Sequence, residues 1–136
     1  MSDEEKPRVP DQIKFVDQTI LHDPEKKIMG NCMQAALASV FGCRIEVIPA
    51  FQDFTDYSWQ EIFKEWLYFI GREYKEKWYP SSEDHPRAEL YIINGKSPRG
   101  VRHSTVWLNG QMIHDPHPSK AGLVNIDSLW SFPRRS

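Results

Sequence analysis

Residues 30–42 read GNCMQAALASVFG, and this stretch sets the arrangement expected for the rest of the chain. Apolar residues recur along it at the spacing of one helical face, namely Met33, Ala36, Leu37, Val40 and Phe41. The spacing predicts a helix over 32–41, with the Asn31 side chain capping its first turn and Gly42 ending it. Alanine and serine keep parts of this helix thin, so other elements can approach it closely.

A second helix is predicted after a connector that spans 45–57. It opens with Ser58-Trp-Gln-Glu61, the pattern of a capping box, and ends at Gly71. The polar stretch 72–87 is expected to be a surface excursion. Upstream of the first helix, 13–21 is read as a short strand or an extended segment, and 22–30 as a loop that turns at Asp23-Pro24.

The C-terminal third of the chain has the alternation of β-structure. A strand is predicted over 88–94, a loop over 95–102, and a hairpin over 103–115 that turns at Asn109-Gly110. Helices followed by an antiparallel sheet favour the α+β class. The N-terminal cysteine helix is then expected to pack on a small antiparallel sheet.

Composition excludes several classes of protein. The chain has 136 residues and a formal net charge of −2, so it offers no basic field for nucleic acid. No apolar run approaches the about 18 residues that a membrane span needs. Residues 1–12 are charged and are expected to be a disordered tail, with 13–136 forming a single domain. The two cysteines make no disulfide framework, which favours the cytoplasm.

The predicted helix ranks Cys32 above Cys43 as a nucleophile. A cysteine attacks as its thiolate, and unpaired N–H groups at a helix start stabilise that negative charge. Cys32 lies in the first turn, whereas Cys43 lies just beyond the negative end of the helix. A buried cysteine is usually a packing residue, so this argument gains weight only beside a base and an orienting group.

The predicted hairpin supplies both groups. His103 begins its first strand and Asp115 ends its second strand. A two-residue turn with regular pairing would place these two side chains on opposite faces of the sheet. We therefore expect a bulge, a longer loop or a bend near Pro116 if they act together.

A metal site on the same hairpin is the main chemical alternative. His103, His114, Asp115 and His117 offer several ligands within a short stretch. Neighbouring strand residues point to opposite faces, however, and HDPH matches no established zinc spacing. We expect neither a metal nor another cofactor.

GNCMQAALASV, RHSTVWLNG and IHDPHP together resemble the papain-like cysteine peptidase superfamily. The compact bacterial members are closest in style, namely the C39-like peptidases that cut leader peptides and the NlpC/P60-like amidases. Small uncharacterised phage and bacterial proteins are similar as well. The resemblance spans about residues 12–125 and implies a papain-like α+β fold with Cys32 as nucleophile, His103 as base and Asp115 as the orienting residue.

The resemblance leaves the oxyanion donor open. Papain-like enzymes usually carry a glutamine a few residues before the cysteine, but Lys26 stands there in this chain. Gln18 is the nearest upstream glutamine, and we expect it to act with the Cys32 N–H. Asn31 and Arg99 complete the candidate oxyanion and substrate-binding residues. Arg99 in GKSPRG, or Arg102 just after it, can reach a substrate carboxylate, although a plain connector is the simpler interpretation of this stretch.

Two functions remain as hypotheses. The first is a cysteine hydrolase that cleaves a peptide, isopeptide or amide bond of a peptide or protein through a thioester. A transferase that replaces water by an amine fits the same residues. The second is a non-catalytic papain-like binding module that captures a host or partner protein.

Overall fold

The computed structural model describes residues 15–53 and 59–135, which form two α-helices and one five-stranded antiparallel sheet. The helices are α2 (Cys32–Phe41) and α3 (Trp59–Phe69). The strands are β1 (Lys75–Trp78), β2 (Leu90–Lys96), β3 (Arg102–Leu108), β4 (Gln111–His114) and β5 (Ser128–Ser131). Their order across the sheet is β1-β5-β2-β3-β4. The predicted α+β class is confirmed. The expected tail and Ser58, the first residue of the capping box predicted for the second helix, lie outside the described residues.

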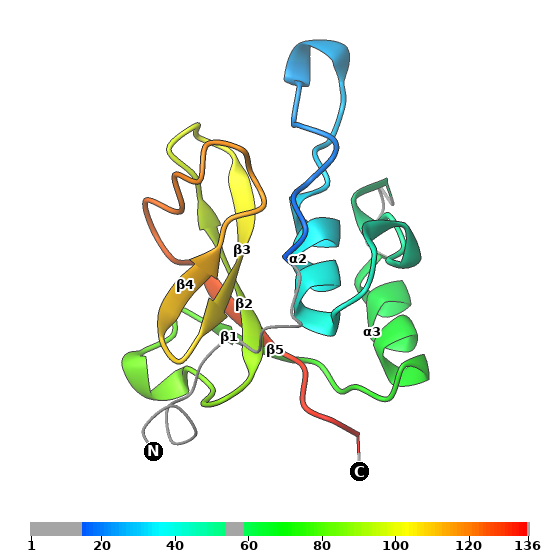
Figure 1. The fold of residues 1–136 in the computed structure, drawn as a ribbon, viewed down its shortest axis with the longest axis vertical. Helices are drawn as coiled ribbons and strands as arrows, with labels where there is room; N and C mark the ends of the chain where they lie inside the picture. Colours follow the sequence, from blue (N-terminus) through cyan, green and yellow to red (C-terminus); the bar gives the residue numbers. More distant parts are fainter. Residues whose placement is uncertain (1–14, 54–58, 136) are drawn as a thin grey trace.

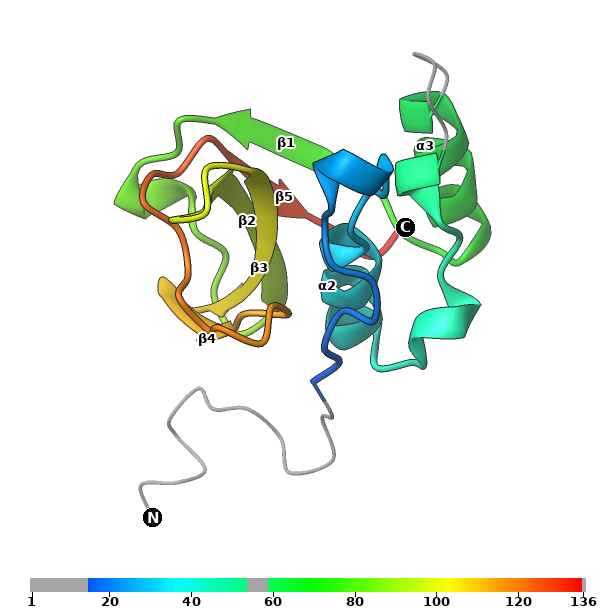
Figure 2. The same ribbon diagram turned by 90° about the horizontal axis from the view of Figure 1, so that it is seen from above.

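Helix α2 stands between the curled sheet and α3 (Figures 1 and 2). It begins and ends at the predicted residues, and Gly42 adopts the left-handed conformation with φ of 70°. The prediction of a single buried face is too narrow, because all five residues from Ala35 to Ser39 are buried. Their small side chains let β3 approach from one side and the segment that contains Ile48 and Phe51 from another.

One buried hydroxyl ties α2 to the N-terminal segment. Ser39 Oγ accepts a hydrogen bond of 2.8 Å from the Val16 N–H and donates one of 3.0 Å to the Ala35 carbonyl. Residues 15–21 form no strand and bend at residues 19 and 20, so the strand alternative for this segment is wrong in its described part. Because the Ser39 hydroxyl both accepts and donates a hydrogen bond, its burial in the core costs little free energy.

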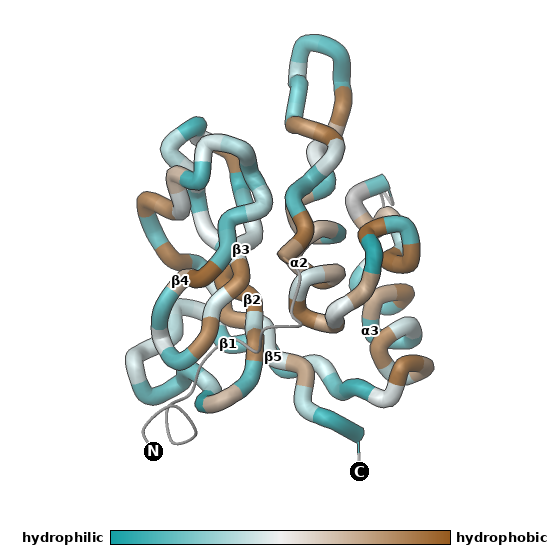
Figure 3. The backbone as a smooth tube through the Cα atoms, viewed as in Figure 1, coloured by the Kyte–Doolittle hydropathy of each residue, from teal (hydrophilic) through white to brown (hydrophobic). Residues whose placement is uncertain are grey.

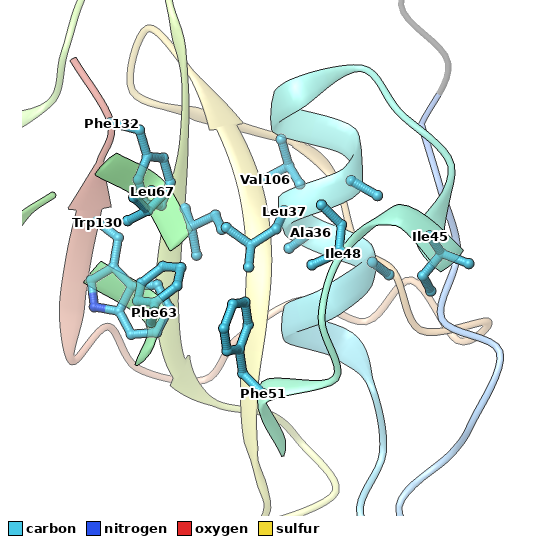
Figure 4. Close-up of a cluster of buried hydrophobic side chains, with 13 residues drawn as sticks. Ala36, Leu37, Ile45, Ile48, Phe51, Phe63, Leu67, Val106, Trp130 and Phe132 are labelled. Carbon is cyan, nitrogen blue, oxygen red and sulfur yellow. The ribbon is translucent and has the colours of Figure 1, made fainter. Parts of the chain in front are cut away.

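Aromatic side chains join α3 to the sheet (Figure 4). Phe63 of α3 lies with its ring centroid 5.6 Å from Trp130 of β5 and 5.1 Å from Phe51. Phe132, just after β5, packs against the same group and against Phe41 of α2. A helix as short as α3 is marginally stable by itself, so the packing of aromatic rings on its buried face, rather than its length, explains its stability.

The hairpin of β3 and β4 contains both a tight turn and a bulge. Asn109 and Gly110 have φ of 50° and 82°, as a two-residue turn of type I′ requires. Leu108 pairs with Gln111, but Val106 pairs with His114, so the register shifts by one residue within β4. The predicted bulge is therefore present, and it accompanies the short turn rather than replacing it.

Three parts of the sheet differ from the sequence prediction. The expected surface excursion 72–87 contains β1, an exposed edge strand that pairs with β5. Strand β2 continues to Lys96, which shortens the predicted loop. Strand β5, which carries Leu129 and Trp130, was not predicted and inserts between β1 and β2. In β2, Gly95 leaves room for the Asn125 carbonyl oxygen, with which a Cβ at this position would collide.

A narrow arm formed by residues 19–30 projects beyond the start of α2 (Figure 1). Asp23 and Ile28 pair across it, and the short helix η1 (Pro24–Lys26) closes its tip. The tip is hydrophilic and the stem carries apolar residues (Figure 3). Within the described residues, none of the helices combines the length and apolarity needed to cross a bilayer.

We predict that Phe63→Ala destabilises the fold strongly whereas Phe69→Ala, on the same helix, does not. Phe63 is 1% exposed and its loss leaves a cavity among the aromatic rings, which costs about 3–5 kcal/mol. Phe69 is 88% exposed, so its removal changes the free energy of unfolding by about 0.5 kcal/mol or less. Urea unfolding measures both, and equal effects would contradict the packing described for α3.

Candidate active site

Cys32 is the first residue of α2 and is partly exposed at the wall of a cleft. The first intrahelical bond runs from the Ala35 N–H to the Asn31 carbonyl, so the Cys32 and Met33 N–H groups lie before the hydrogen bonds of the helix. Burial alone would raise the pKa of the Cys32 thiol. A hydrogen bond and positive charge from His103, with N–H groups of Ser104 and Met33, outweigh burial and lower that pKa.

The other cysteine behaves in the opposite way. Burial raises the pKa of the Cys43 thiol, and no charged partner opposes this effect. The predicted ranking of the two cysteines is confirmed in direction. Its main cause is His103 rather than the helix start alone, because the helix contributes only the Met33 N–H.

His103 and Asp115 form a buried pair. His103 Nε2 lies 2.6 Å from Asp115 Oδ1, and each residue is 2% exposed. The bulge in β4 makes this contact possible, because it turns Asp115 to the same face of the hairpin as His103. Since Nε2 is taken by Asp115, the other ring nitrogen is the one that faces Cys32 in their hydrogen bond.

Two backbone groups hold the Asp115 carboxylate in place. The His117 N–H donates to Oδ1 at 2.9 Å and the Gly122 N–H donates to Oδ2 at 2.7 Å. Burial favours the neutral acid, but the bonds from His103 and from these amides prevail and lower the pKa of Asp115 to about 2. The carboxylate is thus ionised and fixed at neutral pH.

The ionised Asp115 carboxylate stabilises the protonated form of His103. Burial would lower the pKa of His103, but hydrogen bonds to Asp115 and Cys32 raise it to about 9. The imidazole is therefore protonated at neutral pH and donates from both nitrogens. A thiolate on Cys32, an imidazolium on His103 and a carboxylate on Asp115 stabilise one another in this order.

Gln18 lies at the same cleft, as the sequence predicted for an oxyanion donor. Its backbone N–H donates to the Pro116 carbonyl at 3.0 Å, which ties it to the loop after Asp115. Its side-chain Nε2 donates to the Ile20 carbonyl at 2.9 Å and keeps a second N–H. Gln18 Oε1 is buried without a hydrogen-bond partner among the described residues, an unfavourable arrangement of the kind that functional sites retain.

Asn31 has a different role from the predicted ones. It makes no side-chain capping bond, so the capping prediction is wrong. Its Oδ1 accepts from the Thr19 and Ile20 N–H groups at 3.0 and 2.9 Å, and its Nδ2 donates to Thr19 Oγ1. These bonds leave one Nδ2 N–H of Asn31, whose side chain is not part of the cleft wall, and they position the residues next to Gln18.

The cleft encloses about 790 Å³ between the arm, the start of α3, β1 and the loops that precede His103 and follow Asp115. Arg99 and Arg102 both line it, so both predicted candidates are available to a bound molecule. Arg102 lies over the Trp78 ring at 5.4 Å. Arg99 donates to Ser119 Oγ at 3.1 Å.

Several cleft residues were missed by sequence reasoning. Ser104 and Asn94 form a buried polar floor, with Ser104 Oγ donating to Asn94 Oδ1 at 2.6 Å. Trp59 and Trp78 form apolar walls, and His117 lies beside His103 with ring centroids 6.1 Å apart. The one available signal in the sequence was Asn94, the polar residue of the otherwise apolar run LYIIN. Its role was missed because the partners that a buried asparagine needs become known only with the fold.

The three histidines of the alternative metal site do not all lie at one place. His114 lies on the other face, where Nε2 contacts the Val16 carbonyl at 2.9 Å and its ring stacks on Phe15. In the described part of the chain, no group of three or more His, Cys, Asp or Glu side chains is arranged to hold a metal ion.

Comparison with known proteins gives no relative for this chain: no family model, no curated protein and no solved structure matches it. The chemistry of the site is therefore argued from its own geometry.

We predict that Asp115→Asn shifts the pH dependence of Cys32 alkylation upward. Without the carboxylate, the pKa of His103 falls from about 9 toward its ordinary value, and the imidazolium that stabilises the thiolate is lost near neutral pH. The rate of Cys32 alkylation by iodoacetamide at pH 7 should fall about tenfold for each unit by which the thiol pKa rises.

The matched control is Asp17→Asn, which removes an exposed carboxylate that pairs with Lys120 and does not touch His103. This control should retain the wild-type profile. The coupling between Asp115 and Cys32 would be disproved if both variants, checked for folding by circular dichroism, followed the same pH curve.

Proposed function

We propose that the protein is a papain-like cysteine hydrolase that cleaves a peptide, isopeptide or amide bond with Cys32, His103 and Asp115. One observation carries this proposal: His103 Nε2 lies 2.6 Å from Asp115 Oδ1, and the same imidazole lowers the pKa of the neighbouring Cys32 thiol. This group of three side chains opens at its sulfur end into a cleft large enough for a peptide segment. A nucleophile, its base and an orienting group in this order are what acyl transfer requires.

The first half of the reaction forms a thioester. The Cys32 thiolate attacks the substrate carbonyl carbon, and the carbonyl electron pair moves to oxygen. The Cys32 backbone N–H and the second N–H of Gln18 Nε2 stabilise that oxyanion. When the intermediate collapses, the C–N bond breaks and His103 gives its proton to the leaving amine.

The second half restores the enzyme. Neutral His103 removes a proton from water, the hydroxide attacks the thioester, and the acid leaves as Cys32 regains its thiolate. Asp115 holds the ring throughout and stabilises its charged form. An amine in place of water would make the enzyme a transferase with the same residues.

The arrangement of elements supports the papain-like assignment. The nucleophile begins a buried helix, the base lies on the strand packed against that helix, and the orienting residue follows the next strand. These are the relations that the resemblance implies. The oxyanion glutamine precedes the nucleophile by 14 positions in this chain, and its place in the cleft comes from the fold of the arm rather than from nearness in sequence.

Selective alkylation tests the activated thiol. At pH 6.5 only about 1% of an ordinary thiol is ionised, so a lowered pKa accelerates the reaction with iodoacetamide at least about tenfold. We expect peptide mapping to find Cys32 modified well before Cys43, and His103→Gln to remove the difference. Equal slow labelling of both cysteines in the wild-type protein would refute the proposal.

Turnover is tested with a proteome-derived peptide library. Mass spectrometry of new amino termini should reveal cleavage by the wild-type protein and by Cys43→Ala, and none by Cys32→Ala. If the wild-type protein enriches particular peptides as strongly as Cys32→Ala does and cleaves none, the protein is a binding module and the hydrolase assignment is wrong.

A further inference from the structure

The cleft has two chemically different sides around the proposed nucleophile. Apolar side chains gather on the side of the arm and β1, where Leu21, Met29 and Trp78 are each about half exposed. The other side is built from the loops at 97–101 and 115–122 and carries Arg99 and His117. The position of the leaving amine in the proposed reaction decides which side of the cleft contacts the released half of the substrate.

His103 fixes that position. Because His103 must protonate the leaving nitrogen, this nitrogen has to lie next to the ring nitrogen that faces Cys32. Groups that contact His103 therefore flank the released half of the substrate. His117 is the one that does so from the loop side, with its ring edge-on to His103 at a centroid distance of 6.1 Å.

The orientation of the His117 ring is set by Ser119. The Ser119 N–H donates to His117 Nδ1 at 3.0 Å, so Nδ1 is an acceptor and the proton lies on Nε2. Burial and the charges of Arg99 and His103 lower the pKa of His117 and keep the ring neutral. Its Nε2–H has no hydrogen-bond partner among the described residues and remains a donor for a ligand in the cleft.

Arg99 adds a cation at the same place. Ser119 Oγ accepts from Arg99 Nη1 at 3.1 Å and lies 2.9 Å from His117 Nδ1, so one serine holds both side chains. No carboxylate pairs with Arg99 in the described part of the chain, and its side chain lines the cleft. Asp115, the one buried acid among the described residues, already accepts hydrogen bonds from His103, His117 and Gly122.

We propose that Arg99 and His117 form a subsite for a carboxylate on the leaving-group side, so that the substrate releases an amine that bears an acidic group. This inference rests on the proposed hydrolase reaction. In the α-carboxylate of a C-terminal amino acid, the acid is attached only one carbon away from the released nitrogen. In this proposal a carboxylate at that distance accepts from the His117 Nε2–H and is attracted by the Arg99 guanidinium, whereas a neutral amide lacks the charge attraction.

Arg102 provides a matched comparison. It lines the same cleft, carries the same charge and precedes His103, but its guanidinium lies over Trp78 on the opposite wall. Loss of either arginine changes the net charge of the cleft equally. Only loss of Arg99 should change selectivity on the leaving-group side.

The probes are N-iodoacetylglycine and N-iodoacetylglycinamide, which differ only in a terminal carboxylate or amide. Both alkylate cysteine, and Cys43 in the same chain reports their intrinsic reactivity ratio. We expect Cys32 of the wild-type protein to prefer the acid about tenfold relative to Cys43, as one charge-assisted contact provides. Arg99→Gln should abolish the preference, while Arg99→Lys and Arg102→Gln should retain most of it.

The outcomes separate the two proposals. If Cys32 reacts no faster than Cys43 with either reagent, the hydrolase proposal fails and the subsite fails with it. If Cys32 reacts fast but shows no preference for the acid, or if Arg102→Gln lowers the preference as much as Arg99→Gln does, the subsite alone is overturned.

Discussion

The bulge in β4 is the constraint on which the site depends. Without the extra residue, Asp115 would point to the face now occupied by His114, and His103 would lose its carboxylate. The bulge also helps to end β4 at His114, so the part of β3 around Ser104 has a free edge. The start of α2 meets that edge, where the Ser104 N–H reaches the Cys32 sulfur. One irregular residue thus brings Asp115 to the same side of the sheet as His103 and Cys32.

The core and the site are held by the same helix. Because α2 is thin and buried on every side in its middle, its first residue cannot shift without disturbing packing against the sheet and α3. Polar bonds extend this rigidity outward. Ser39 fixes Val16, and Asn31 fixes residues 19 and 20, so Gln18 is held between two anchored points. Preorganisation of this kind is what an oxyanion donor needs.

The sequence could predict features with a local physical signal. Helix α2 and the Asn109-Gly110 turn were predictable because helical spacing and positive φ act within a few residues. Strand β1 was not, since KEKW is exposed throughout and lacks alternation. The partners of Asn31 were hidden for a related reason. A side chain at a helix start suits both a cap and a long-range anchor, and only the position of the arm decides between them.

The net charge of the proposed triad decides whether a neighbouring cation accelerates the reaction or only selects the substrate. In the proposed reaction, Cys32, His103 and Asp115 carry −1, +1 and −1 charges before attack, and after thioester formation only the carboxylate is charged. The net charge of the triad is therefore the same at both stages. A cation beside it, such as Arg99, attracts a substrate carboxylate equally in the ground state and along the acylation path, which gives selectivity without acceleration. In that reaction acceleration comes instead from groups near the oxygen to which the charge moves, a role that we propose for Gln18 and the Cys32 N–H.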